Sequence, residues 1–322
     1  MGDGTPRTYS IRRDVLQPTG CYREDVWGCE VVSKRLTVLT MTNTSMRSWF
    51  ITGATSGIGR ALLEAALERG ERAAALARRV ELLEDLQQTH GERLLTIATD
   101  VARAEEVTAA VAQTVGAFGR IDVVANNAGY GLFGAVEEAT DEQARAIFDT
   151  NVFGVLNVLR AVLPQLRAQG SGHVLQGSSY YGQTAHPGVG LLAATKYAVE
   201  GLTDALVGEV APLGIKVTAL EPGPTATAFL ANLDLASTIP AYDQTVRVVQ
   251  QEIGALPPSA FSAPGRVVDA IFAVVDADQP PLRLATGSYA VEQIRGALQA
   301  RLTAIDAWSA ISAAVDAASP VA

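Results

Sequence analysis

The stretch TGATSGIG (52–59) decides the fold, because it places three glycines between a run typical of a buried strand and a run typical of a helix. The preceding SWFIT (48–52) is short and apolar, and the residues that follow are amphipathic at helical spacing. Gly53, Gly57 and Gly59 allow a tight turn and a close approach of the backbone to a pyrophosphate. The start of the next helix adds free N–H groups and the positive end of the helix dipole. Glycines also mark ordinary turns, but in this strand–loop–helix context they predict dinucleotide binding.

Short apolar runs alternate with amphipathic stretches along the chain. Strands are expected at 48–52, 72–77, 94–98, 121–125, 173–177, 215–220 and 281–287, and helices at 60–69, 80–89, 103–118, 141–168, 191–211 and 289–317. Largely apolar strands separated by helices indicate a parallel sheet covered on both faces. We therefore expect an α/β fold, with residues 46–322 as a single doubly wound Rossmann-type domain that carries a substrate lid at about 225–265 and a C-terminal helical segment.

Residues 1–45 differ from the rest, because they carry no useful periodicity apart from the short apolar stretch 36–39. We interpret them as a disordered extension or a misassigned start, with Met41 or Met46 as the real beginning; a functional arm is the alternative. The only two cysteines lie in this segment without a nearby histidine, so neither a disulfide framework nor a metal site is expected.

Composition limits the partners. The chain has 322 residues and a net charge of −9 at pH 7, which argues against nucleic acid and anionic membranes, because both require a basic face. The sequence has no uninterrupted apolar run of about 18 residues, so a transmembrane helix is not expected. The polar N-terminus also lacks the apolar core of a signal peptide. A cytoplasmic location is expected.

The end of the second expected strand indicates the cofactor. An NAD site usually has a carboxylate there, about 20 residues past the glycines, to accept from the ribose 2′-OH. This chain has Arg78 and Arg79, and no acid until Glu81. An arginine fork suits a 2′-phosphate, so the pattern favours NADP(H) over NAD(H); a solvated basic pair at a helix start is the alternative.

Together these features resemble the short-chain dehydrogenase/reductase family, closely over residues 47 to about 230. The matching motifs are TGATSGIG (52–59), Asp100-Val101, NNAG (126–129), Asn151 in DTNVFG, the serine pair 178–179 and EPGPTAT (221–227). The resemblance implies that Ser179, Lys196 and Asn151 take part in catalysis. The cofactor-binding residues that it implies, with Arg78 added from the charge argument, are Gly53, Thr55, Ser56, Gly57, Ile58, Gly59, Arg78, Asp100, Val101, Asn127, Ala128, Gly129, Lys196, Pro222, Gly223, Thr225 and Thr227.

One position departs from the family pattern. The family keeps a proton-donating tyrosine four residues before its lysine and thirteen after its serine, and both spacings lead to Leu192. No tyrosine in the chain has a lysine four residues after it. Loss of a general acid typically lowers the rate about 10²–10⁴-fold, roughly 3–5 kcal/mol of barrier. Tyr130, Tyr180, Tyr181 and His186 are expected at the rim of the site, as substrate-packing or solvated residues or as a replacement acid.

The sequence therefore predicts an NADP(H)-dependent oxidoreductase that acts on a secondary alcohol or ketone and is impaired in proton transfer. A catalytically silent NADPH-binding protein and a non-redox enzyme on the same scaffold are the alternatives. The apolar lid suits a small hydrophobic carbonyl or alcohol substrate. The resemblance implies a homodimer or homotetramer. Its interface would use an apolar stripe at helical spacing, although the same stripe could instead cover the sheet. The stripe is formed by Val152, Val155, Leu156, Leu159 and Leu163.

Overall fold

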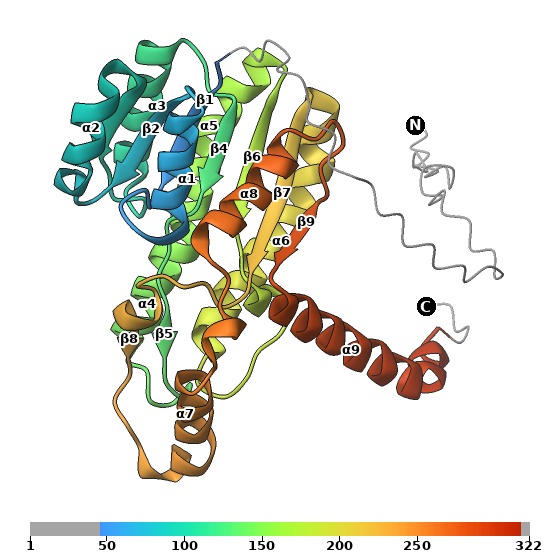
Figure 1. The fold of residues 1–322 in the computed structure, drawn as a ribbon. Helices are drawn as coiled ribbons and strands as arrows, with labels where there is room; N and C mark the ends of the chain where they lie inside the picture. Colours follow the sequence, from blue (N-terminus) through green and yellow to red (C-terminus); the bar gives the residue numbers. More distant parts are fainter. Residues whose placement is uncertain (1–45, 317–322) are drawn as a thin grey trace, which may run out of the picture. The chain divides into compact units, whose positions relative to one another are not determined.

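Seven parallel strands form the centre of the fold in the computed structural model, which describes residues 46–316. Residues 1–45, interpreted above as an extension or upstream sequence, lie outside the described residues. The strands follow the order β3-β2-β1-β4-β6-β7-β9 (Figure 1). Their bounds are β1 Ser48–Thr52, β2 Arg72–Ala77, β3 Leu94–Ala98, β4 Val123–Asn126, β6 Gly172–Gly177, β7 Ile215–Pro222 and β9 Arg283–Thr286. The expected doubly wound α/β fold is confirmed.

Helices cover both faces of the sheet because its strands are apolar on both sides. The helices are α1 Gly57–Glu68, α2 Glu84–His90, α3 Ala104–Phe118, α4 Asp141–Phe148, α5 Gly154–Gln169, α6 Gly190–Val210, α7 Val248–Gly254, α8 Pro264–Val275 and α9 Ser288–Ala314. Side chains of α3, α5 and α6 share one core with the sheet, and those of α1 and α8 share the other. Because β1 lies between β2 and β4, the loops after β1 and β4 diverge at the carboxyl edge, where such sheets bind ligands.

The helix expected at 141–168 is present over Asp141–Gln169, but it contains one irregularity that the sequence did not predict. A π-helical turn, Asp149–Phe153, separates α4 from α5. Apolar periodicity could not reveal it, because one wider turn changes the register by only one residue. The whole run Asp141–Gln169 is long and apolar enough to cross a membrane. Its apolar side chains cover the sheet instead, including Val155 and Leu159 of the stripe considered for association.

A short parallel pair of strands lies beyond the carboxyl edge of the sheet and was not expected from the sequence. β5 (Leu132–Phe133) follows β4, and β8 (Asp234–Leu235) belongs to the lid segment. The Asp234 N–H donates to the Gly131 carbonyl at 2.9 Å, and Ala236 donates to Phe133 at 3.0 Å. These bonds tie the segment after β7 to the segment after β4.

The last helix, α9, leaves the sheet and projects away from it (Figure 1). Ala290 is its one buried residue, and every residue from 298 to 316 is exposed. Its exposed large apolar side chains are Val291, Leu298, Leu302, Ile305, Trp308 and Ile311. Helices in proteins gain most of their stability from packing, so these exposed apolar side chains are candidates for further contacts.

Candidate active site

The conformation of the glycine loop between β1 and α1 depends on its glycines, as Gly53 and Gly59 show. Gly53 has a φ of 67°, in the left-handed region that favours glycine. A Cβ on Gly59 would lie 2.3 Å from the Gly53 carbonyl oxygen and 2.5 Å from Asn127 Nδ2. The loop and the first turn of α1 therefore pack backbone against backbone. Ser56, the N-cap residue, makes no side-chain cap hydrogen bond, so its side chain leaves the first N–H groups of α1 free for a ligand.

The glycine loop is joined to the segment after β4 by Thr52. Its Oγ1 accepts hydrogen bonds from the N–H groups of Asn127 and Ala128, both at 2.9 Å. Asn127 Nδ2 donates in return to the Thr52 carbonyl at 3.2 Å. Sequence reasoning missed Thr52; the available signal was a hydroxyl residue at the end of a buried strand, directly before Gly53.

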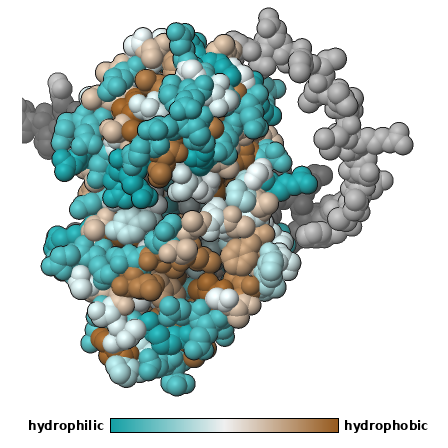
Figure 2. Space-filling view, turned by 60° about the vertical axis from the view of Figure 1, so that its left-hand side comes forward, coloured by the Kyte–Doolittle hydropathy of each residue, from teal (hydrophilic) through white to brown (hydrophobic). Residues whose placement is uncertain are grey.

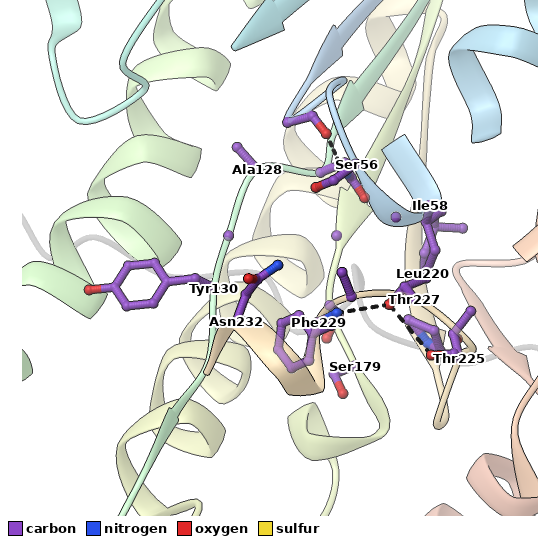
Figure 3. Close-up of a pocket in the computed structure, with 18 of the residues that line it drawn as sticks. Ser56, Ile58, Ala128, Tyr130, Ser179, Leu220, Thr225, Thr227, Phe229 and Asn232 are labelled. Carbon is purple, nitrogen blue, oxygen red and sulfur yellow. Dashed lines mark hydrogen bonds between the residues drawn. The ribbon is translucent and has the colours of Figure 1, made fainter. Parts of the chain in front are cut away.

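A cavity of about 400 Å³ opens at this edge of the sheet. Its wall includes the expected cofactor residues except Gly59, which packs behind the loop. Figure 3 shows Ser56 and Ile58 at the start of α1, Ala128 and Tyr130 after β4, and Ser179 after β6 around this space. On the face drawn in Figure 2, hydrophobic surface gathers around a hollow across the middle. Within residues 46–316, no cluster of metal-ligating side chains is found.

Ser179, Lys196 and Leu192 meet on the wall of this cavity. Ser179 Oγ accepts a hydrogen bond from the Tyr181 N–H at 3.2 Å, which leaves its own hydrogen free to donate. Lys196 Nζ donates to the Gly177 carbonyl at 2.7 Å, and burial lowers the pKa of Lys196 to about 8. Leu192 lies one helical turn before Lys196 on α6 and is 4% exposed.

Asn151 lies behind the cavity wall in the π-helical turn. Its Oδ1 accepts from the Tyr130 N–H at 3.1 Å, and its Nδ2 donates to the Tyr130 carbonyl at 2.9 Å and to Thr195 Oγ1 at 3.2 Å. A Cβ on Gly129 would lie 3.0 Å from Asn151 Oδ1 and 3.7 Å from Lys196 Nζ. The absence of a side chain at Gly129 therefore lets these two groups approach the cavity together.

The rim residues named from the sequence are packed more closely than solvated loop residues. Tyr130, Tyr180 and Tyr181 all line the cavity. The Tyr181 hydroxyl lies 2.6 Å from His186 Nε2, and the rings of Tyr180 and Tyr181 are 4.0 Å apart between centroids. Burial raises the pKa of Tyr181 to about 12, so this phenol is a weaker acid than an ordinary tyrosine.

Arg78 and Arg79 lie at the far end of the cavity, after β2, and both are exposed. Asp100 and Val101, after β3, line the same end. The cavity therefore runs from this basic end, past the glycine loop, to Ser179 and Lys196. The basic pair, the glycine cradle and the free start of α1 fit a dinucleotide phosphate group.

Comparison with known proteins identifies the family. The family model for short chain dehydrogenases matches residues 47–237. The oxidoreductase BOA17 of Botryotinia fuckeliana is 38% identical over 268 residues, which cover 83% of this chain and 98% of that protein. A short-chain dehydrogenase from Streptomyces avermitilis is 36% identical with a TM-score of 0.78, covering 84% of this chain and 98% of that one. This chain belongs to the short-chain dehydrogenase/reductase family of oxidoreductases.

Solved structures with this fold hold both kinds of nicotinamide dinucleotide. A short chain dehydrogenase from Burkholderia cenocepacia, in complex with NADP, is 29% identical with a TM-score of 0.64, covering 81% of this chain and 96% of that one. Others contain NADH or NAD. The family therefore explains a dinucleotide site at this edge of the sheet, and the choice between the two cofactors rests on the residues of this chain.

Proposed function

We propose that this chain is an NADP(H)-dependent oxidoreductase for a secondary alcohol or ketone, slowed in proton transfer because Leu192 occupies the position of the family's tyrosine. One observation carries the proposal: Ser179, Leu192 and Lys196 line the same cavity as the glycine loop, with Leu192 one turn before Lys196. The site therefore contains a hydrogen-bond donor and a cation, but an alkyl side chain where a phenol would complete the set.

The roles of the residues follow from their chemistry. A bound nicotinamide supplies a hydride to the carbonyl carbon. Ser179 would donate a hydrogen bond to the carbonyl oxygen, and Lys196 would hold the nicotinamide ribose and place positive charge near the developing alkoxide. Asn151, bonded to the Tyr130 backbone, would keep the cavity wall in position. Hydride transfer without the phenol would keep only part of the usual rate, about 10²–10⁴-fold below a complete site.

Two features support the choice of ligands. The exposed Arg78 and Arg79 match a 2′-phosphate, which favours NADP(H). The substrate end of the cavity is lined by apolar lid residues, which favours a hydrophobic carbonyl or alcohol; they are Phe229, Leu230, Ile253, Leu256 and Phe261. We assign the lid to about residues 225–265, because its β8 strand pairs with β5, which follows β4.

Association into a homodimer or homotetramer is part of the proposal. Three of the five stripe residues, Val152, Val155 and Leu159, are buried in the chain's own core, so they cannot form the interface. Phe153 remains 53% exposed, and the large apolar side chains along α9 are exposed as well. Sedimentation velocity would measure the assembly state. A cytoplasmic location remains our expectation.

The experiment that tests the proposal compares the chain with its Leu192→Tyr variant in NADPH consumption over a panel of hydrophobic ketones. A gain of about 10²-fold or more in the variant is expected, because tyrosine restores a general acid beside Lys196. NADPH binding that persists without turnover in either protein would support the silent NADPH-binding alternative. Product formation without net NADPH consumption would support non-redox chemistry.

A further inference from the structure

Two buried carboxylates lie behind the candidate active site. Glu200 is one helical turn after Lys196 on α6 and is 5% exposed. Glu221 is the second-last residue of β7, directly before Pro222 and Gly223 of the cavity wall, and is 2% exposed. Carboxylates are rarely this buried unless they are paired with charge or hold a proton.

Among residues 46–316, Arg283 is the only cation within salt-bridge distance of this pair, and it also pairs with Asp204. Arg283 Nε lies 2.8 Å from Glu200 Oε2 and 3.7 Å from Glu221 Oε1, while its Nη2 lies 2.5 Å from Asp204. One partly exposed guanidinium thus serves three acidic groups. Gln183 Nε2 also donates to Glu221 at 2.9 Å.

The arrangement favours one proton shared by Glu200 and Glu221. Burial, opposed by the Gln183 hydrogen bond and reinforced by the neighbouring Glu200, raises the pKa of Glu221 to about 7. Glu200 Oε1 is buried. If Glu200 and Glu221 are both ionised, this oxygen has no hydrogen-bond donor among residues 46–316. A proton on Glu221 would provide the missing donor within the pair, since two adjacent carboxylates do not both ionise readily.

Glu200 also lies one helical turn from Lys196 on α6. Its charge acts on Lys196, where it opposes the lowering of the lysine pKa by burial. Ser178 lines the cavity, and a Cβ on Gly182 would lie 2.6 Å from Ser178 Oγ and 3.1 Å from Glu200 Oε1. The hydroxyl and the carboxylate therefore converge at Gly182, between the cavity and the buried pair.

We infer that Lys196 is itself the proton donor in this chain, and that the Glu200–Glu221 pair is the buried reserve that returns a proton to it. The inference rests on the proposed reductase function. The hydride adds to the carbonyl carbon while the carbonyl π electrons move to oxygen. An N–H bond of the Lys196 ammonium breaks as an O–H bond forms, which leaves an alcohol and a neutral amine. The proton of Glu221, passed through Glu200, restores the ammonium, and solvent at the Arg283 end reprotonates the pair.

The pH dependence follows from the groups that face the pair, which are Lys196 and Asp204 from α6, Gln183 after β6 and Arg283 from β9. Reduction requires the protonated donor and the protonated reserve. Because the relevant pKa values lie at about 7 and about 8, the rate of ketone reduction should fall as the pH rises through this window.

Glu221→Gln, an isosteric variant, tests the role of this positioning residue. In the wild-type background we expect kcat for ketone reduction to fall about tenfold or more, with KM and NADPH affinity unchanged. In the Leu192→Tyr background the restored phenol supplies the proton, so the same change should cost less than about twofold. Glu209→Gln, the same change at an exposed residue of α6 away from Arg283, is the control and should leave the rate unchanged.

An infrared pH titration of the protein without cofactor or substrate gives a readout independent of activity. A protonated carboxyl band that titrates near pH 7 and disappears in Glu221→Gln supports the shared proton; its absence in the wild type overturns the inference. An equal loss of kcat in both backgrounds also overturns it, because it would mark a purely structural role. No turnover in either background would instead refute the proposed function, and with it this inference, even if the band is present.

Discussion

Replacement of Gly59 by alanine should displace the glycine loop and weaken NADPH binding. The added methyl would lie 2.3 Å from the Gly53 carbonyl oxygen, about 1 Å inside the 3.4 Å at which ordinary contact begins. The oxygen belongs to the backbone of the loop, and Asn127 on the other side is fixed by its hydrogen bond to Thr52. The loop must therefore move away from α1.

The expected cost can be sized from this geometry. Overpacking of a tight contact costs about 1–3 kcal/mol, partly offset by the better helix propensity of alanine, up to about 1 kcal/mol. If this cost reduces the binding free energy of NADPH, the affinity should drop about 10- to 100-fold, since 1.4 kcal/mol is a factor of ten in the dissociation constant. Isothermal titration calorimetry with NADPH measures this directly.

Gly201→Ala provides the matched control. Gly201 is exposed in the middle of α6, and a Cβ there meets nothing within 4 Å. This variant should keep wild-type NADPH affinity and gain about 0.5–1 kcal/mol of stability. Wild-type affinity in Gly59→Ala, or a lower melting temperature in Gly201→Ala, would refute the reasoning.

Two further predictions concern charge. Arg78→Ala should weaken NADPH binding about tenfold while NADH binding changes little, because only the 2′-phosphate loses a charge-assisted hydrogen bond; an unchanged ratio of the two dissociation constants would remove the case for NADP(H). Burial lowers the pKa of His173 to about 4, so between pH 6.5 and 4 the unfolded chain binds a proton that the folded chain does not. The free energy of unfolding should therefore fall by about 3 kcal/mol from this group as the pH drops through that window, and urea denaturation at several pH values should show a shallower decline for His173→Gln.

Much of the fold could be read from local patterns. The seven strands of the main sheet and the helix α6 begin and end within about two residues of their expected bounds, because apolar runs and their glycine stops report local conformation directly. Ser179, Lys196 and the expected cofactor residues other than Gly59 line one cavity. Their meeting could be predicted because the carboxyl ends of parallel strands lie at one edge of the sheet.

Local sequence patterns could not predict contacts between distant segments. The π-helical turn that carries Asn151 alters periodicity too little to detect, and the β5–β8 pair joins two dipeptides about 100 residues apart. Nothing in the local sequence around Glu200 or Glu221 indicates that Arg283 would be their shared partner.

The sequence by itself determined the doubly wound sheet, the glycine loop and the presence of Leu192 one turn before Lys196, because each depends on residues close together in the chain. Only the tertiary structure decided which side chains are desolvated and which charges they meet. Burial lowers the pKa of Lys196 and raises that of Glu221, and burial arises from the packing of β6, β7, β9 and α6 together. Protonation at this site is therefore a property of the folded chain, since the cost of removing a charge from water depends on everything packed around it.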